Sequence, residues 1–213
     1  MEFIDENIEQ YALAHSQPEN SVLSKLNRET HAKVMQPRML SGHMQGNFLA
    51  MISKMVKPDR VLEIGTYTGY SAICLAQGLN DNGKLYTIDV NEELEGMVRK
   101  YVKEASLDSK INIMIGDAMK IIPSLKEQFD IVFIDADKKN YANYYDLIFD
   151  KVKTGGYIIA DNVLWSGKVL DLQKNKDTDT LLIDAFNKKV HQDERVEHML
   201  LPLRDGLMIV RKK

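Results

Sequence analysis

The chain has 213 residues, 44% of them hydrophobic, with a formal net charge of −3. This length is typical of one domain, and the slight acidity argues against a basic surface for nucleic acid or anionic membranes. Cys74 is the only cysteine, which excludes an internal disulfide and a multi-cysteine metal site. The acidic first 16 residues lack the apolar core of a signal peptide, and no apolar run approaches the roughly 20 residues of a membrane span. We therefore expect a cytoplasmic protein without membrane contacts.

The N-terminal quarter of the chain is helical in pattern. Residues 20–35 and 42–56 carry apolar side chains at helical spacing, and Pro37 separates the two stretches. No convincing strand precedes residue 58. We expect a single domain over residues 1–213, in which residues 1–57 form helices and residues 58–213 form a sheet-containing core.

From residue 58 onward, short apolar runs alternate with helical segments. The expected strands are "RVLEIG" (60–65), "KLYTIDV" (84–90), "INIMIGDA" (111–118), "FDIVFIDA" (129–136) and "GYIIADNV" (156–163). Strands that alternate with helices predict an α/β fold, a Rossmann-like doubly wound sheet covered on both faces. The end of the chain, "VEHMLLPLRDGLMIVRKK" (196–213), predicts an antiparallel hairpin at the sheet edge, turning at Arg-Asp-Gly.

Acid and amide side chains end two of the predicted strands. Asp135 and Asp137 follow one strand, and Asp161 and Asn162 follow the next. Ligands of open α/β sheets bind outside the carboxyl ends of the strands, and consecutive strands are often neighbours. Their oxygens would then converge into a site for Mg²⁺, with Mn²⁺ or Ca²⁺ as alternatives. The other interpretation is that Asp and Asn simply favour turns at these positions.

The loop after the first predicted strand, "LEIGTYTGYS" (62–71), indicates a nucleoside site. Its glycines have GxxxG spacing instead of the GxGxxG of dinucleotide sites, which argues against an NAD-dependent oxidoreductase. Glu63, directly ahead of this loop, would repel a pyrophosphate but suits a cationic ligand. Asp89 lies twenty residues after Gly69, where an acid usually binds ribose hydroxyls, and Asp117 could face the base. S-adenosylmethionine fits these features, although each acid could also be a turn residue.

From about Met39 to the C-terminus, the chain resembles the S-adenosylmethionine-dependent, metal-dependent O-methyltransferases of the catechol and caffeoyl-CoA type, and is most similar to their small bacterial members. The matching segments are "EIGTYTGYS" (63–71), "ID" (88–89), "GDA" (116–118), "FIDADKKNY" (133–141) and "DNVLWSG" (161–167). The resemblance implies an antiparallel last strand, a homodimer, and a methyltransferase domain in which residues 1–57 cover the active site.

The resemblance also implies roles for individual residues. Asp135, Asp161 and Asn162 match the metal ligands, and Lys138 matches a catalytic lysine base that acts beside Asp135. The positions expected to contact the cofactor are Ser41, Glu63, Gly65, Thr66, Ser71, Asp89, Ala118, Asp135 and Asp137. The implied reaction is methyl transfer to a hydroxyl of a small aromatic diol, which is chelated by the metal.

The acceptor itself stays open at the level of sequence. Ser166 stands where plant caffeoyl-CoA enzymes carry an Asn that touches substrate, and residues 1–38 and 166–180 match poorly. Trp165 could line the acceptor pocket or merely pack. A second interpretation keeps the chemistry but changes the acceptor to a hydroxylated uridine in tRNA, which the net charge weakly opposes.

Overall fold

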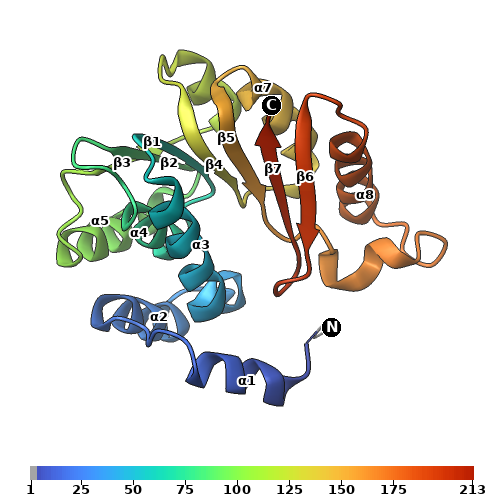
Figure 1. The fold of residues 1–213 in the computed structure, drawn as a ribbon. Helices are drawn as coiled ribbons and strands as arrows, with labels where there is room; N and C mark the ends of the chain where they lie inside the picture. The colour runs from blue at the N-terminus through green and yellow to red at the C-terminus, as the bar shows by residue number, and fades with distance from the viewer. Residues whose placement is uncertain (1–3) are drawn as a thin grey trace.

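The computed structural model describes residues 4–213 and contains one seven-stranded sheet (Figure 1). Its strand order is β3-β2-β1-β4-β5-β7-β6. The strands are β1 (Arg60–Ile64), β2 (Lys84–Asp89), β3 (Ile111–Ile115), β4 (Phe129–Ile134), β5 (Val152–Ala160), β6 (Val196–Leu201) and β7 (Leu207–Lys212). The first five strands run parallel, and β7 is antiparallel to both β5 and β6. The predicted Rossmann-like sheet with an antiparallel C-terminal strand is therefore confirmed.

The strand order reverses between β1 and β4. From β1 the chain winds outward through β2 to β3, and it then returns to β4 on the other side of β1. Ligand sites in open α/β sheets lie at such a switch point, outside the carboxyl ends of the strands. The loops after β1 and β4 are thus the expected walls of a binding cleft.

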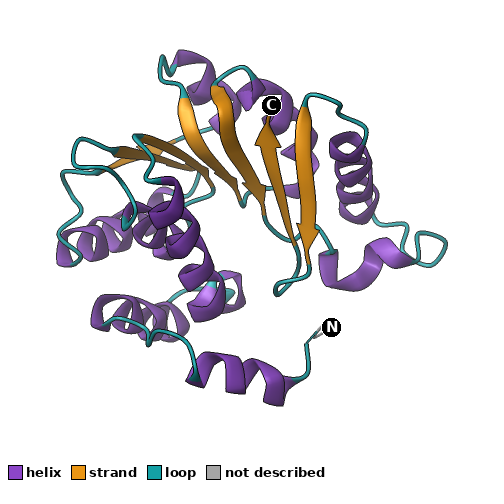
Figure 2. Ribbon diagram, viewed as in Figure 1, coloured by secondary structure: helices purple, strands orange, loops and turns teal. Residues whose placement is uncertain are grey.

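Helices cover both faces of the sheet (Figure 2). Along β4, Val132 and Ile134 face one core cluster, and Ile131 and Phe133 face the other, as the two-residue period of a strand requires. The helices of the core are α4 (Tyr70–Ala76), α5 (Glu95–Glu104), α6 (Ala118–Ile121), α7 (Tyr141–Phe149) and α8 (Thr178–His191). Short 3₁₀ turns are η2 (Glu92–Leu94), η3 (Ile122–Ser124), η4 (Lys138–Asn140) and η5 (Trp165–Leu170).

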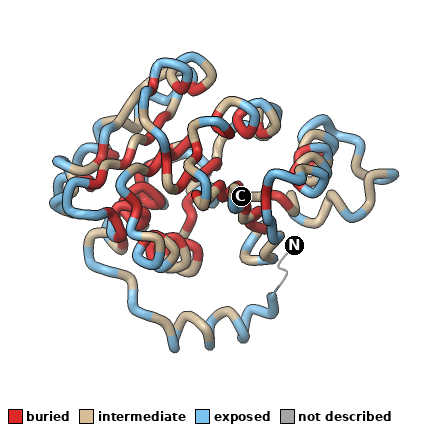
Figure 3. The backbone as a smooth tube through the Cα atoms, turned by 45° about the horizontal axis from the view of Figure 1, so that its top comes forward, coloured by how far each residue is buried: buried red, intermediate tan, exposed pale blue. Residues whose placement is uncertain are grey.

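The N-terminal segment forms helices α1 (Glu6–Ala14), α2 (Ser21–Lys33) and α3 (Gly42–Val56). Pro37 opens the 3₁₀ turn η1 (Pro37–Met39) between α2 and α3, as the sequence predicted. Helix α3 packs closely on α4, since a Cβ at Gly46 would lie 2.6 Å from the Tyr70 ring. Helix α1 buries no residue and lies apart from the sheet (Figure 3). Residues 1–3 of the predicted helical segment lie outside the described residues.

Within residues 4–213, none of the helices is both long and apolar enough to cross a membrane.

Candidate active site

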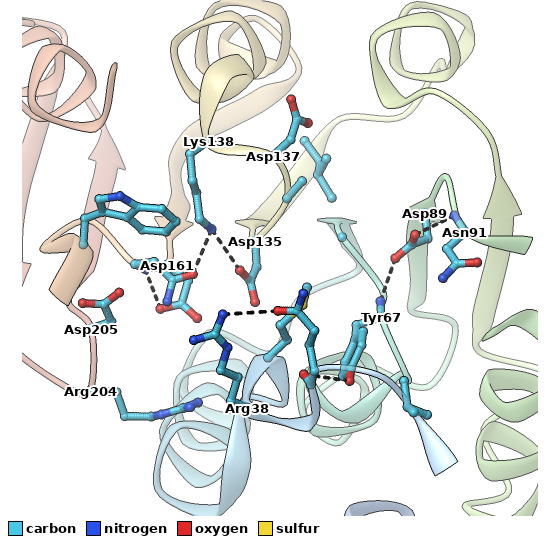
Figure 4. A pocket seen from close by; sticks show the side chains of 18 of the residues that line it. Arg38, Tyr67, Asp89, Asn91, Asp135, Asp137, Lys138, Asp161, Arg204 and Asp205 are labelled. Atoms are coloured by element: carbon cyan, nitrogen blue, oxygen red, sulfur yellow. Dashed lines mark hydrogen bonds and ion pairs between the residues drawn. The ribbon is translucent and has the colours of Figure 1, made fainter. Parts of the chain in front are cut away.

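A cleft of about 1880 Å³ opens at the carboxyl ends of the parallel strands (Figure 4). Eight of the residues predicted from the sequence line it, namely Gly65, Asp89, Ala118, Asp135, Asp137, Lys138, Asp161 and Asn162. The other four, Ser41, Glu63, Thr66 and Ser71, are buried, with 0–5% of their surface exposed. The fold therefore gathers eight of the twelve candidate residues, including all the candidate metal ligands and Lys138, around one space.

Gly65 allows the loop after β1 to approach the end of β4. Its φ of +100° lies in the region that favours glycine, and a Cβ there would sit 1.9 Å from the main-chain oxygen of Asp135. The Gly65 amide donates to the Ile88 oxygen at 2.9 Å, which joins the same loop to β2. Any side chain at this position would push the candidate cofactor loop away from Asp135.

Asp89, at the end of β2, organises that loop through three main-chain hydrogen bonds. Its Oδ2 accepts from the amides of Thr66 at 2.9 Å and Tyr67 at 2.7 Å, and its Oδ1 accepts from the Asn91 amide at 2.9 Å. The carboxylate is thereby fixed at the cleft edge. Each oxygen has two lone pairs, so acceptor capacity remains for the hydroxyls of a ribose.

Glu63 lies fully buried behind the cleft wall. The Thr87 hydroxyl donates to its Oε2 at 2.5 Å, whereas its Oε1 has no hydrogen-bond partner. Burial raises the pKa of the Glu63 carboxyl to about 8, against the opposing effect of the neighbouring Ser71 and Thr87 hydroxyls. A buried carboxyl with an orphaned oxygen is stabilised by a nearby donor or positive charge, so this position fits the cationic methionine portion of S-adenosylmethionine.

The three candidate metal ligands come from neighbouring strand ends. Strands β4 and β5 are paired in parallel with Ile134 opposite Ala160, so Asp135 and Asp161 follow in register. Asn162 comes directly after Asp161 with a φ of 58°, and its Oδ1 and Asp135 Oδ1 both contact the Lys138 ammonium. The Lys138 ammonium lies 3.3 Å from Asp135 Oδ1 and 2.8 Å from Asn162 Oδ1, so the strand ends already surround a positive charge (Figure 4).

Asp161 is held by two further hydrogen bonds. Gln45 Nε2 donates to its Oδ2 at 2.6 Å, and the Asn162 amide donates to its Oδ1 at 2.7 Å. Burial, together with the charge of Asp135, raises the pKa of the Asp161 carboxyl well above its usual range. The carboxylates of Asp135 and Asp161 repel each other, and together with the amide oxygen of Asn162 they offer only oxygen ligands. Such ligands fit Mg²⁺, with water in its remaining coordination positions. No group of three or more His, Cys, Asp or Glu side chains among residues 4–213 is arranged for a metal, and the third oxygen of this candidate site belongs to the amide of Asn162.

Lys138 is a mostly buried residue instead of a surface lysine, with 10% of its side chain exposed. Besides the two oxygens above, its ammonium lies 2.5 Å from the Tyr141 hydroxyl. Tyr141 is itself fully buried and donates to the Asp161 main-chain oxygen at 3.0 Å. This network holds the lysine nitrogen in the cleft beside the candidate ligands.

One protein family matches nearly the whole sequence of this chain. The model of that family, described as O-methyltransferase, covers residues 13–213. The chain belongs to the O-methyltransferase family. It is 32% identical over 222 residues to the caffeoyl-CoA O-methyltransferase of Stellaria longipes, covering 97% of this chain and 90% of that protein. The Medicago sativa caffeoyl-CoA O-methyltransferase is 34% identical over 196 residues, with 87% of this chain and 79% of that protein covered.

Solved structures agree with this membership. The O-methyltransferase from Bacillus cereus, determined in complex with SAH, superposes with a TM-score of 0.90 at 28% identity, and the match covers 97% of each chain. The protein is thus an S-adenosylmethionine-dependent O-methyltransferase of the caffeoyl-CoA type, as the sequence predicted.

Two features of this O-methyltransferase were missed at the level of sequence. Gln45 contacts Asp161, from which 116 residues separate it in sequence. The only sequence signal for a role of Gln45 was that it lies in the region that resembles the O-methyltransferases. The turn of the C-terminal hairpin also joins two walls of the cleft. Arg204 Nη1 donates to the main-chain oxygens of Leu40 and Ser41, while the amide of Leu164 donates to the Asp205 oxygen at 2.9 Å.

Trp165 both lines the cleft and packs against the core, so the two interpretations of this residue are compatible. Its φ of 49° and that of Ser166, 55°, are strained for residues with side chains. The Ser166 amide donates to Asp205 Oδ1 at 2.5 Å, which helps to hold this turn in place. The O-methyltransferase presents the indole ring of Trp165 in the cleft, with its centroid 6.0 Å from the Lys138 ammonium.

Proposed function

We propose that this O-methyltransferase transfers the methyl group of S-adenosylmethionine to one hydroxyl of a small aromatic diol held at a divalent metal, most suitably Mg²⁺. The observation that carries the proposal is the convergence of oxygens from Asp135, Asp161 and Asn162 in the same cleft as Asp89. The caffeoyl-CoA O-methyltransferases among its relatives support an aromatic diol as the acceptor class.

The cofactor would lie along the loop after β1. Asp89 would accept hydrogen bonds from the ribose hydroxyls, and Gly65 lets the main chain approach without a side chain in between. Ala118 and Asp137 also line the cleft and would contact the cofactor, and the buried residues Ser41, Thr66 and Ser71 would help to hold its binding loop and wall. Glu63 would supply the negative charge that a sulfonium and an ammonium require.

The protein's residues would orient the acceptor and remove its proton. Asp135, Asp161 and Asn162 are the residues that would hold the metal, whose charge lowers the pKa of a hydroxyl and fixes its position. The attacking oxygen forms a bond to the methyl carbon as the carbon–sulfur bond breaks, leaving S-adenosylhomocysteine. Lys138 would accept the hydroxyl proton, because its nitrogen lies 3.3 Å from Asp135 Oδ1 and 2.8 Å from Asn162 Oδ1, beside the residues that would hold the acceptor. We further propose a homodimer in which residues 1–57 cover the active site.

The test is methyl transfer from labelled S-adenosylmethionine to caffeate and to p-coumarate, which lacks the second hydroxyl. We expect caffeate to exceed p-coumarate in kcat/KM by on the order of a hundredfold, because a single oxygen loses the orientation that chelation provides. Chelator should abolish the reaction and Mg²⁺ should restore it. The Asp161→Ala variant should lose transfer but keep cofactor binding, whereas Asp171→Ala, in the exposed loop, is the control. Full activity in chelator would contradict the proposal, and methylation of tRNA instead of any diol would favour a hydroxylated uridine.

A further inference from the structure

Arg38 brings a positive charge to the mouth of the cleft. It lies in η1, lines the cleft, and donates to Gln36 Oε1 at 3.3 Å. Figure 4 shows its guanidinium directed into the cleft on the side of Asp135 and Asp161, away from Asp89. No carboxylate within residues 4–213 forms an ion pair with it. Arg38 therefore carries an uncompensated charge on the acceptor side.

Five other basic side chains line the cleft, and all of them except Lys139 already have partners. Lys33 pairs with Glu29 at 2.8 Å, Lys138 with Asp135 at 3.3 Å and Lys168 with Asp177 at 3.4 Å, and Arg204 donates to the Leu40 oxygen at 3.1 Å. Their hydrogen bonds stabilise the walls of the cleft. Arg38 differs from these four because most of its five N–H donors are available to a ligand, and it differs from Lys139, which also forms no ion pair within residues 4–213, because a guanidinium can bind an anion through two parallel hydrogen bonds.

The main chain that carries Arg38 is anchored to the cofactor loop. The Tyr67 hydroxyl lies 3.2 Å from the Gln36 oxygen and 3.4 Å from the Met35 oxygen, and its single hydrogen can be donated to either (Figure 4). The Tyr67 amide in turn donates to Asp89. The position of Arg38 is thus tied to the loop that would hold the cofactor.

Large, exposed apolar side chains from the N-terminal segment line the same cleft as Arg38. Ile4, Ile8, Met35 and Met39 all line the cleft, and their exposed fractions are 38%, 62%, 86% and 56%. Exposed apolar groups clustered at a cleft indicate contact with an apolar part of a ligand. The cleft, at about 1880 Å³, is also larger than the roughly 300–1,000 Å³ that encloses a drug-sized molecule.

We propose that Arg38 is an anion subsite, which binds a carboxylate or a phosphate that the aromatic acceptor carries beyond its ring. This inference rests on the proposed function, since it assigns a second contact to the same acceptor. A guanidinium binds either group through two parallel hydrogen bonds, and the apolar side chains that line the same cleft contact the linker between ring and anion. Arg38 thereby selects acidic diols over neutral ones.

The experiment compares three diols in the wild type, Arg38→Met and Arg38→Lys. The diols are 4-methylcatechol, which is neutral, caffeate, which carries a carboxylate, and 3,4-dihydroxybenzyl phosphate. We expect Arg38→Met to raise KM for the anionic diols at least tenfold with little change in kcat, and to leave 4-methylcatechol unaffected. Arg38→Lys should recover phosphate binding better than carboxylate binding, because an ammonium lacks the bidentate geometry. Arg28→Met removes an exposed arginine on α2 and is the matched control.

Binding of the same diols to the complex with S-adenosylhomocysteine, measured by calorimetry, tests the subsite independently of turnover. An anion preference that disappears in Arg38→Met supports the inference even if no methyl transfer is detected. Equal affinity of the wild type for neutral and anionic diols would overturn it, as would an equal loss for all three diols in Arg38→Met. Failure of the proposed function would instead appear as absent methyl transfer to every diol.

Discussion

Gln45 Nε2 donates a 2.6 Å hydrogen bond to Asp161 Oδ2, although 116 residues separate the two side chains in sequence. Both are buried, with 0% and 3% of their surface exposed. Arg204 Nη1 lies 3.4 Å from Gln45 Oε1, so the amide is oriented with its nitrogen toward the acid. Gln45 therefore fixes the direction in which Asp161 presents its oxygens.

The first prediction removes this donor. Gln45→Leu keeps the approximate volume but leaves Asp161 Oδ2 without its partner, so the carboxylate can rotate away from Asp135. We expect Mg²⁺ affinity, measured by calorimetry, to fall about tenfold, which corresponds to about 1.4 kcal/mol for a lost hydrogen bond to a charged group. S-adenosylmethionine affinity should stay within twofold. Asn47→Leu, which changes an amide on the same helix that contacts the Gln17 oxygen, is the control. Unchanged Mg²⁺ affinity in Gln45→Leu would show that Gln45 acts only in packing.

The second prediction concerns the close approach of Gly65 to Asp135. In Gly65→Ala, the new Cβ would overlap a main-chain oxygen at 1.9 Å and the backbone would keep an unfavourable φ of +100°. We expect a loss of about 1–3 kcal/mol in the free energy of unfolding, together with weaker S-adenosylmethionine binding, because the loop must move. Gly96→Ala is the matched control. Gly96 lies within α5 with nothing within 4 Å of its Cβ position, so alanine there should stabilise the protein by up to about 1 kcal/mol. Equal effects of the two substitutions in chemical denaturation would contradict this account.

The third prediction follows from the pKa of Glu63, which burial raises from 4.5 to about 8. The folded protein retains a proton here that the unfolded chain releases, so the stability from this group is complete below pH 4.5 and is lost as the pH rises toward 8. Between pH 5 and pH 8, the wild type should lose a few kcal/mol of unfolding free energy that Glu63→Gln retains. Denaturation of both proteins at each pH measures the difference, with Glu92→Gln on the surface as the control. An identical pH dependence in wild type and Glu63→Gln would contradict the raised pKa.

The same residue links the cofactor to protons. A cationic ligand favours the charged form of Glu63, so S-adenosylmethionine binding at pH 7 should release a proton. Calorimetry in buffers with different ionisation enthalpies detects this release, and Glu63→Gln should lack it. An absence of proton release in the wild type would show that the positive charge of the ligand lies far from Glu63.

The sheet could be predicted because buried parallel strands appear as continuous apolar runs, and "FDIVFI" and "RVLEI" retain that pattern at β4 and β1. The cleft could be predicted because strand ends meet at one edge, which brings Asp89, Asp135 and Asp161 together regardless of loop structure. Local rules were therefore sufficient for residues whose position depends on their own strand.

Residues whose roles depend on contacts between distant segments were not predictable in this way. Gln45 occupies one position of an amphipathic helix, and nothing in its spacing indicates that its partner is Asp161, the acid directly after β5. Arg204 occupies a hairpin turn, and its link to Leu40 depends on how that turn packs against the N-terminal segment. Glu63 was expected to contact the cofactor, yet its burial behind Thr87 depends on the packing of β2 beside β1.

The last prediction distinguishes a proton acceptor from a positive charge at Lys138. Its ammonium lies 2.8 Å from Asn162 Oδ1 and 2.5 Å from the Tyr141 hydroxyl. Lys138→Arg keeps the charge but cannot accept a proton, because the guanidinium does not deprotonate in proteins. If Lys138 accepts the hydroxyl proton, kcat should fall on the order of a hundredfold or more in both Lys138→Arg and Lys138→Met, with S-adenosylmethionine affinity unchanged. Lys139→Met, one residue later, controls for the loss of a neighbouring charge. Wild-type kcat in Lys138→Arg would assign Lys138 a purely electrostatic role, in which it balances Asp135 and its neighbouring acids.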